Sequence, residues 1–402
     1  MASVPDPRVE GAANPAAGAE ACPRLAVTRL LLANFRSYAQ GEVLTNGRPV
    51  VLAGPNGAGK TNVLDAISLL SPGRGLRGAR LGDHIRKGPQ ASEGALWTVA
   101  ATVARGSESY EIGTGLAAGP EGSERRLVHL NGAPAQSSAD LGEIVQMIWL
   151  TPAMDRLFTE SASGRRRFLD RLVLGFDSGH ARRALRYEHA MRERIRLLKF
   201  GPRDPAWLDG LEAEMAETGI AMTAARVETI ARLNAALAAR EAAGVFPCAQ
   251  LSLAGEMAPL ADSDRDGAMA ALQAMLAGAR IADAQMRRTT IGPHLCDLAV
   301  RHTAKRMEAR DCSTGEQKAL LISIVLADAW ELARARDGFA PLLLLDEVAA
   351  HLDARRRAAL FEEILALRAQ AWMTGTDLSL FETLGSRADI FFVNSGEFAR
   401  QE

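Results

Sequence analysis

The spacing of apolar and polar residues divides the chain into three parts. In residues 97–130, short runs of alternating apolar and polar residues are separated by Gly and Ser, which predicts antiparallel hairpins. Residues 163–260 are rich in Ala, Arg, Glu and Leu, and their Gly and Pro would stop any heptad run after roughly two dozen residues. Several helices joined by short breaks are therefore expected there. Strand patterns return near residue 290, so a helical segment separates two parts of an α/β protein.

Continuous apolar runs and helical periodicity supply the elements of a layered core. The runs that fit buried strands are residues 25–32, 50–52, 341–347, 371–376 and 390–393. The patterns that fit helices are residues 62–70, 319–330 and 355–368. In the first of these helices Val63, Ile67 and Leu70 share one face, which is typical of a helix that packs on a sheet.

A phosphate-binding loop follows the strand at residues 50–52. Residues 54–61 fit the spacing G-x-x-x-x-G-K-[ST] between a strand and a helix. The glycines let successive N–H groups point inward, and the N-terminus of the following helix favours an anion. Lys60 can reach the β- and γ-phosphates of a nucleoside triphosphate such as ATP, and the Thr61 hydroxyl can bind Mg²⁺. The predicted nucleotide-binding residues of this loop are Gly54, Pro55, Asn56, Gly57, Ala58, Gly59, Lys60, Thr61 and Asn62.

The alternative for this loop is a glycine-rich turn with a chance Lys-Thr pair. The strand before it and the helix after it both argue for the phosphate-binding interpretation.

The expected partner of this loop is the apolar strand that ends in Asp346 and Glu347. Asp346 is predicted to bind Mg²⁺, and Glu347 to lie beside the water that attacks the γ-phosphate. The alternative is that these two acids only begin a loop and take no part in chemistry. Lys60 and Asp346 are much further apart in sequence than a compact NTPase needs, so the helical middle is interpreted as an insertion.

This interpretation divides the chain into four segments. They are an N-terminal extension at residues 1–23, the two halves of an ATPase head at residues 24–150 and 288–402, and an inserted helical arm at residues 151–287.

The composition is that of an ordinary globular chain. Its 402 residues, 48% hydrophobic content and net charge of −1 allow a large core and do not exclude nucleic acid as a partner. The four cysteines contain no CxxC pair, which argues for a reducing compartment and against a zinc site or disulfide framework. Residues 1–23 are rich in Ala, Pro and Gly and read as a disordered extension, not a signal peptide. No apolar run is long enough for a membrane span, so a cytoplasmic protein is expected.

Residues 312–316, Cys-Ser-Thr-Gly-Glu, precede the long apolar helix. Ser313 and Glu316 have the spacing of a capping box, in which each side chain bonds the backbone of the other. A capped helix N-terminus with Gly315 beside it is also suited to bind a phosphate. The two uses are compatible.

Together these motifs resemble those of the ATP-binding-cassette (ABC) superfamily. Residues 312–316 stand where its Leu-Ser-Gly-Gly-Gln/Glu signature would be, and residues 350–353 look like its D-loop. The resemblance implies an ABC-type P-loop ATPase head with a mixed sheet and an antiparallel β-subdomain. It also implies that ATP drives head-to-head dimerisation, with Ser313 and Gly315 of one subunit covering the γ-phosphate held by the other. Glu347, Lys60 and Ser313 are then the expected catalytic residues.

Further motifs are similar to those of one family within this superfamily, the bacterial recombination mediators of the RecF family. In the order of that family they are Asn34-Phe-Arg-Ser-Tyr38, residues 54–62, Thr151-Pro152, residues 163–171, Gly292-Pro-His294, residues 342–353 and Thr374-Gly-Thr-Asp377. The resemblance implies recognition of duplex and gapped DNA, slow DNA-dependent ATP hydrolysis, and cooperation with RecR and RecO in loading RecA. The signature departs from the usual pattern at Thr314, and Thr374-Gly-Thr376 replaces the switch histidine of transporter ATPases.

A local excess of arginine in residues 165–203 predicts where DNA binds. Neutralisation of phosphates by a basic stripe is the main source of sequence-independent DNA affinity, and the segment contains too few acids to pair every arginine. The predicted DNA contacts are Arg182, Arg183, Arg186, Arg192, Arg194, Arg196 and Lys199. The alternative is a solvated helix face with Glu–Arg pairs, and one of Arg165, Arg166 and Arg167 could instead bond within the fold. No aromatic residues alternate with the basic ones, which favours recognition of backbone and duplex shape.

Other classes of protein share parts of this pattern. The nucleotide-binding subunit of a transporter has the same head but usually a short insertion. A long-armed, SMC-like chromosome protein would need hundreds of heptad residues and often a CxxC hook. A binding clamp with vestigial hydrolysis fits the residues as well as an active ATPase does.

Overall fold

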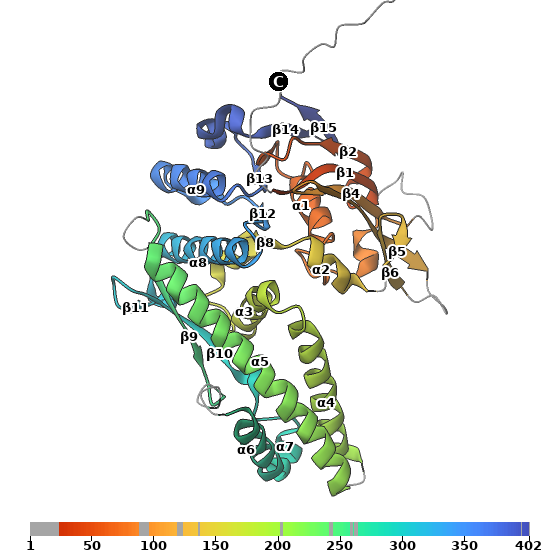
Figure 1. Cartoon of the computed structure of the whole chain (residues 1–402), viewed down its shortest axis with the longest axis vertical. Coiled ribbons are helices and arrows are strands. Elements are labelled where there is room, and N and C mark those ends of the chain that lie inside the picture. The colour runs from red at the N-terminus through yellow and green to blue at the C-terminus, as the bar shows by residue number, and fades with distance from the viewer. Residues whose placement is uncertain are drawn as a thin grey trace, which may run out of the picture.

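The computed structural model describes residues 24–87, 96–118, 124–135, 137–201, 204–240, 244–257, 260, 264–394 and 396–401. The predicted N-terminal extension, residues 1–23, lies outside the described residues. Figure 1 shows two sheets packed beside each other in one half of the molecule and a group of helices that projects from them.

The first sheet is antiparallel, with the strand order β2-β1-β4-β5-β6-β7. Its strands are β1 (Leu25–Phe35), β2 (Tyr38–Leu44), β4 (Thr98–Arg105), β5 (Glu108–Ala118), β6 (Glu124–Leu130) and β7 (Ala133–Pro134). The antiparallel pairing of β4, β5 and β6 confirms the hairpins predicted in residues 97–130.

The second sheet has the order β15-β14-β3-β13-β12-β8 and is parallel except at the edge strand β15. Its strands are β3 (Val50–Ala53), β8 (Met147–Leu150), β12 (Leu342–Leu345), β13 (Ala371–Gly375), β14 (Asp389–Asn394) and β15 (Glu397–Arg400). Strands β3, β12 and β13 are buried along their whole length, which is why they read as unbroken apolar runs. The sheet therefore interleaves strands from the two ends of the chain.

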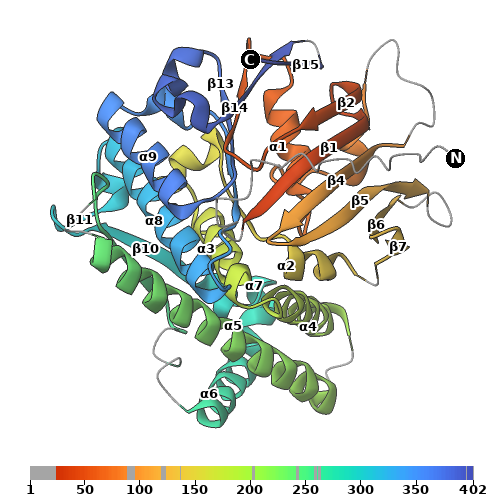
Figure 2. The same ribbon diagram turned by 45° about the horizontal axis from the view of Figure 1, so that its top comes forward.

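Successive residues of the second sheet face two different cores. Val50 and Leu52 of β3 belong to a cluster with the first sheet and helix α1 (Lys60–Ser68), whereas Val51 belongs to a cluster with α8 (Thr314–Ala335) and α9 (Ala354–Leu367). Side chains alternate across a strand, so one short strand joins both cores. Figure 2 shows α8 and α9 on one side of this sheet and α1 with the first sheet on the other.

The projecting helices come from the middle of the chain. They are α3 (Ala162–Phe176), α4 (His180–Phe200), α5 (Pro205–Arg240), α6 (Arg265–Gly278) and α7 (Arg280–Met286). Gly201 follows the last residue of α4 and Pro205 is the first residue of α5, so the Gly and Pro of this stretch separate two helices, which pack side by side in both views (Figures 1 and 2). The several helices joined by short breaks that the sequence predicted are confirmed, and α5, with 36 residues, is the longest of these five although it contains Gly210 and Gly219. A glycine in a helix interior costs about 1 kcal/mol relative to alanine, which tertiary packing can offset.

A third, small sheet lies beside these helices and has the order β11-β10-β9. Its strands are β9 (Ala249–Ala254), β10 (Asp297–His302) and β11 (Met307–Glu308). Strand β9 falls in a stretch whose sequence was expected to be helical, and it pairs antiparallel with β10. The domain boundaries proposed from sequence stay a prediction. Within the described residues, no helix combines the length and apolar character needed to cross a membrane.

The amide of Gln370 joins the two larger sheets. Its Oε1 accepts from the backbone N–H of Val27 at 2.8 Å and from the indole N–H of Trp372 at 3.1 Å, and its Nε2 donates to the carbonyl of Val27 at 3.0 Å. The register of β1 against β4 shifts between Val27 and Arg29, so the side chain serves backbone groups next to an irregularity. Gln370 is 1% exposed, and water cannot replace these bonds.

Replacing Gln370 with Leu should lower the free energy of unfolding by about 2–4 kcal/mol, because the N–H groups of Val27 and Trp372 would remain buried without acceptors. Urea unfolding monitored by tryptophan fluorescence measures the change. Gln250→Leu is the matched control, since Gln250 is exposed on β9 and its replacement should change stability by less than about 0.5 kcal/mol. Equal unfolding midpoints for the two variants would contradict the role of Gln370.

Candidate functional site

The loop between β3 and α1 has the backbone conformation that its glycines predict. Gly54, Gly57 and Gly59 have φ angles of +150°, +81° and +109°. A Cβ at Gly54 would lie 2.2 Å from the carbonyl oxygen of Val393, and one at Gly59 would lie 2.6 Å from Ser37 Oγ. A Cβ at Gly57 would meet nothing within 4 Å. Close packing therefore requires two of the glycines, and backbone conformation alone accounts for the third.

The turn between β1 and β2 forms one wall of this loop. The buried Tyr38 hydroxyl donates to the carbonyl of Gly59 at 3.1 Å, and Asn62 Nδ2 donates to Ser37 Oγ at 3.0 Å. Burial raises the pKa of Tyr38, so the phenol keeps its proton and remains a donor. The sequence predicted Asn62 as a site residue but not Ser37 and Tyr38, although both belong to a motif quoted above.

Lys60 points its ammonium group back into the loop. Its Nζ donates to the carbonyls of Gly54 at 2.7 Å and Pro55 at 2.9 Å. Burial lowers the pKa of Lys60, whereas the carboxylates of Glu347 and Asp346 raise it. These two acids thus lie close enough to act on the lysine, as their place after β12 predicts.

Asp346 connects the loop to the two strands beside it. Its carboxylate accepts from the hydroxyl of Thr61 at 2.9 Å and from that of Thr374 at 2.7 Å. Thr374 Oγ1 also accepts from the backbone N–H of Glu347 at 2.8 Å, and Glu347 has the left-handed φ of +52°. In the sequence, Thr374 appeared in a family motif and as a departure from a switch histidine, but not as a site residue. It lies on β13, the neighbour of β12, and holds both acids in position.

Oxygen donors of this kind suit a hard cation. Thr61 supplies a hydroxyl and Asp346 a carboxylate, which are ligand types that Mg²⁺ prefers. The structure thus brings Lys60, Thr61, Asp346 and Glu347 together, which is the arrangement that the sequence predicted for a nucleotide site.

The signature-like segment lies elsewhere in the chain. Ser313 is the N-cap of α8, and its N–H and Oγ both donate to Glu316 Oε2, at 3.1 and 2.9 Å. An ion pair with Lys305 and these two bonds lower the pKa of Glu316 to about 2. The predicted capping interaction is confirmed. Ser313 and Gly315 are exposed, and a Cβ at Gly315 would meet nothing within 4 Å.

Within one chain, the start of α8 and the phosphate-binding loop are not brought together. β11, which comes shortly before this segment in sequence, lies at one edge of the molecule in both views, whereas α1 lies beside the two larger sheets (Figures 1 and 2). Ser313 and Gly315 therefore do not contact the loop of their own chain.

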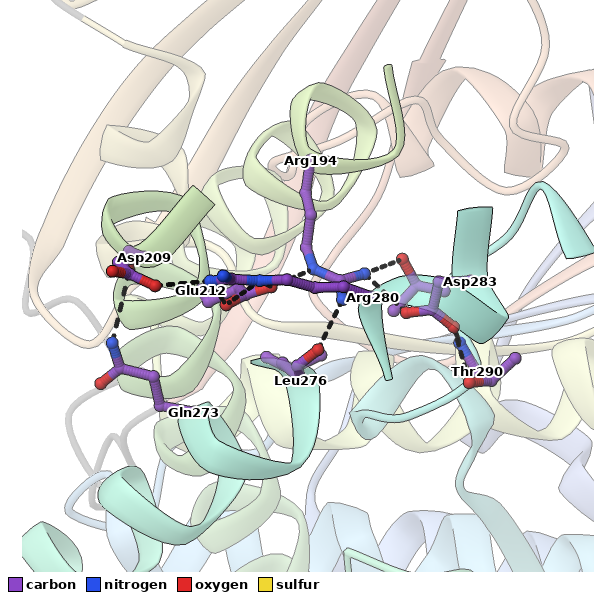
Figure 3. Close-up of polar contacts among 9 residues, drawn as sticks. Arg194, Asp209, Glu212, Gln273, Leu276, Arg280, Asp283 and Thr290 are labelled. Carbon is purple, nitrogen blue, oxygen red and sulfur yellow. Dashed lines mark hydrogen bonds and ion pairs between the residues drawn. The ribbon is translucent and has the colours of Figure 1, made fainter. Parts of the chain in front are cut away.

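The prediction that Arg194 contacts DNA is wrong. Its side chain is fully buried, and it forms ion pairs with Glu212 at 2.8 Å and Asp283 at 2.6 Å (Figure 3). Its Nη2 also donates to the carbonyl of Leu276 at 2.7 Å. The acids that neutralise it come from α5 and α7, outside the basic segment, so a local count of charges could not reveal them.

Other arginines of α4 are also paired. Arg186 pairs with Glu214 and Glu217 of α5, which lie outside the counted segment, and Arg183 pairs with Asp177, which lies within it. The inference that acids are too few to pair these arginines is therefore wrong for part of the set. Arg182, Arg192 and Arg196 are exposed, and Lys199 is partly buried; their role as DNA contacts stays a prediction.

Two of the arginines at the start of α3 bond within the fold, as the alternative interpretation had it. Arg165 binds both carboxylate oxygens of Asp297, at 2.9 and 2.7 Å, and Arg166 donates to the carbonyl of Cys296 at 2.8 Å. They attach α3 to the start of β10.

Comparisons with known proteins identify the family. Residues 26–397 match the family model described as RecF/RecN/SMC N terminal domain. A DNA replication and repair protein RecF from Agrobacterium fabrum is 50% identical over 378 residues, which cover 93% of this chain and 98% of that protein. The chain belongs to the RecF family. RecF proteins of Rhizobium etli (strain CIAT 652) and Mesorhizobium japonicum are each 48% identical and cover 93% and 92% of this chain and 98% and 96% of their own.

Solved structures show that the fold is shared. A structure of the recombination mediator protein RecF-ATPrS has a TM-score of 0.80 at 20% identity and covers 94% of this chain and 98% of its own. An Smc head domain of Pyrococcus furiosus has a TM-score of 0.52 at 17% identity, with 94% and 96% coverage. The predicted ABC-type ATPase head fold is confirmed. Membership of the RecF family supports the recombination-mediator interpretation. It gives no support to the transporter alternative.

Replacing Arg194 with Met should destabilise the protein by about 3–5 kcal/mol, because Asp283 would be left as a buried charge without its cation. Arg196→Met is the control on the same helix, with a side chain that is 74% exposed, and should change stability by less than about 0.5 kcal/mol. The measurement is the urea midpoint of each variant. A stable Arg194 variant would show that the buried ion pairs do not hold these helices together.

Proposed function

We propose that the chain is an ATP-dependent DNA clamp of recombinational repair and replication restart. The observation that carries this proposal is the contact of Asp346 with Thr61 and Thr374. Through this contact the phosphate-binding loop and the acid pair lie together at the carboxyl ends of neighbouring parallel strands. Membership of a family of DNA replication and repair proteins supports it.

In the proposed site, the backbone N–H groups of residues 54–61 and the N-terminus of α1 bind the phosphates of ATP. Lys60 adds a cation that is already held inside the loop. Thr61 and Asp346 would hold Mg²⁺, which when bound neutralises charge on the phosphate oxygens. Glu347 orients and polarises the attacking water, and Thr374 positions Glu347 through its backbone N–H.

Hydrolysis in this proposal requires a second copy of the chain. Ser313 and Gly315 are exposed at the start of α8 and lie far from the loop of their own chain, so they are free to cover the γ-phosphate held by a partner. Loss of that phosphate would remove what Ser313 binds and let the dimer open. ATP then acts as a switch, and turnover is expected to be slow and dependent on DNA.

Glu347→Gln should trap an ATP-bound dimer, because the amide cannot polarise water while binding is preserved. Lys60→Met is the paired variant and should bind no nucleotide and stay monomeric. Sedimentation velocity with saturating ATP and Mg²⁺ separates these outcomes. If the Glu347 variant remains monomeric while it binds ATP, closure in trans is wrong.

For DNA, we propose that the projecting helices of two closed copies line a cleft around the duplex. Three exposed cations of α4, Arg182, Arg192 and Arg196, support this placement. We further propose a cytoplasmic protein that acts on duplex and gapped DNA and cooperates with RecR and RecO in loading RecA.

The double variant Arg192→Glu, Arg196→Glu should bind duplex DNA more weakly, and the slope of log affinity against log salt should fall by roughly two, or about 0.9 for each lost phosphate contact. Anisotropy titrations of a labelled duplex at several salt concentrations give this slope. Arg334→Glu is the control, because its side chain is 76% exposed at the far end of α8. An unchanged slope would move the DNA surface away from α4.

A further inference from the structure

The end of the arm furthest from the sheets carries several large apolar side chains in solvent. Phe200 at the end of α4 is 87% exposed, and Ile281 on α7 is 75% exposed. Trp207 and Met286, close by in sequence on α5 and α7, are 52% and 58% exposed. Clustered apolar exposure of this kind marks interaction surfaces, because water contact with it is unfavourable.

Phe200 and Ile281 border an open groove of about 660 Å³, which we call the arm-tip groove. Its walls are the end of α4, the first turn of α5 and α7, and Leu208 contributes to its floor. The volume lies within the range of roughly 300–1,000 Å³ found for ligand-binding pockets. It can therefore accept several side chains of a partner.

The groove is held in shape by the buried ion pairs described above. Figure 3 shows Arg194 between Glu212 and Asp283, with Arg280 bonded to Asp209 and Glu212. Arg280 itself lines the groove, so the ion pairs reach its wall. A small apolar cluster of Leu197, Leu198 and Leu208 lies beneath it. A wall fixed in this way loses little entropy when a partner binds.

The charge of the groove selects the kind of partner. Lys199, Arg280 and Arg287 line it, and none of the lining residues in the described part of the chain is acidic. The ion-pair network behind the wall contains three carboxylates, Asp209, Glu212 and Asp283, for the two guanidinium groups of Arg194 and Arg280. Lys199 and the exposed Arg287 outnumber this one excess acid, so the groove keeps a small net positive charge on its open side.

We propose that the arm-tip groove docks an acidic amphipathic helix of another protein. Apolar anchors at i, i+3, i+4 and i+7 would enter between α4 and α7 beside Phe200 and Ile281, and the acidic face would meet Lys199 and Arg287. A second copy of this chain is disfavoured because it would bring like charges together. This site goes beyond the proposed clamp, since it lies at the opposite end of the molecule from the nucleotide loop (Figure 1).

The test uses the full chain without nucleotide and a fluorescein-labelled helical peptide of about 18 residues built from Leu, Ala and Glu, with Leu at i, i+3, i+4 and i+7. One control peptide has the same composition without an apolar face, and another has Lys in place of Glu. Fluorescence anisotropy should show the acidic amphipathic peptide binding at least about tenfold more tightly than either.

Three variants assign the binding to this groove. Phe200→Ser, Ile281→Ser together should weaken binding by about tenfold or more, and because both side chains are exposed the fold is not at risk. Arg287→Glu should weaken it several-fold, with a smaller loss at high salt. Leu185→Ser, 65% exposed on α4 outside the groove, is the matched control and should bind as the parent chain does.

Three results would overturn the proposal. The first is that the acidic peptide and the control peptides bind with equal affinity. The second is that the Phe200, Ile281 double variant binds the acidic peptide as tightly as the parent chain does. The third is that the parent chain forms a dimer without nucleotide and the double variant does not. The last result would assign the groove to a second copy. The two peptide results do not bear on the Lys60 and Glu347 experiment. A nucleotide-free dimer would also appear in the Lys60→Met variant, and its loss in the Phe200, Ile281 double variant separates it from ATP-driven closure, so the two proposals can fail separately.

Discussion

The carboxylate of Asp346 is the contact on which the nucleotide site depends. Its Oδ1 accepts one hydroxyl hydrogen bond from the phosphate-binding loop and one from the neighbouring strand β13, so three segments of the chain meet at one oxygen atom. The charge of this carboxylate also favours the protonated form of Lys60 against the effect of burial. Loop, acid pair and positioning threonine are consequently joined by a continuous set of hydrogen bonds.

Sequence patterns were sufficient for those parts of the site that obey local rules. The spacing of Gly54, Lys60 and Thr61 follows from the shape of a loop around phosphates, and the apolar run before Asp346 follows from burial on both faces of a sheet. Ser37, Tyr38 and Thr374 were not found as site residues, because their roles arise from neighbouring strands and not from spacing along the chain. Strand β9 was missed for a related reason, since a short strand in an alanine-rich region is defined mainly by its pairing with β10.

The arginines of α4 show where counting charges along a sequence fails. Arg194 and Arg186 look alike in sequence, yet one is buried between two acids and the other forms exposed pairs with α5. A helix turns each successive side chain by about 100°, so neighbours in sequence face different environments. The excess of positive charge is therefore divided between holding the helices together and facing solvent. Arg192 and Arg196 belong to the second group.

The position of β3 has a consequence for how the protein is made. The strand that precedes the phosphate-binding loop lies between β13 and β14, which follow it in sequence only after the whole helical arm and strand β12. During synthesis the loop sequence is therefore made long before either neighbour of its strand. Pairing of the two chain ends over so long a separation is entropically costly and slow. A nascent chain in which β13 and β14 have not yet been made thus has the loop sequence without the two strands that flank it, and the acid pair and Thr374 cannot yet be positioned beside the loop.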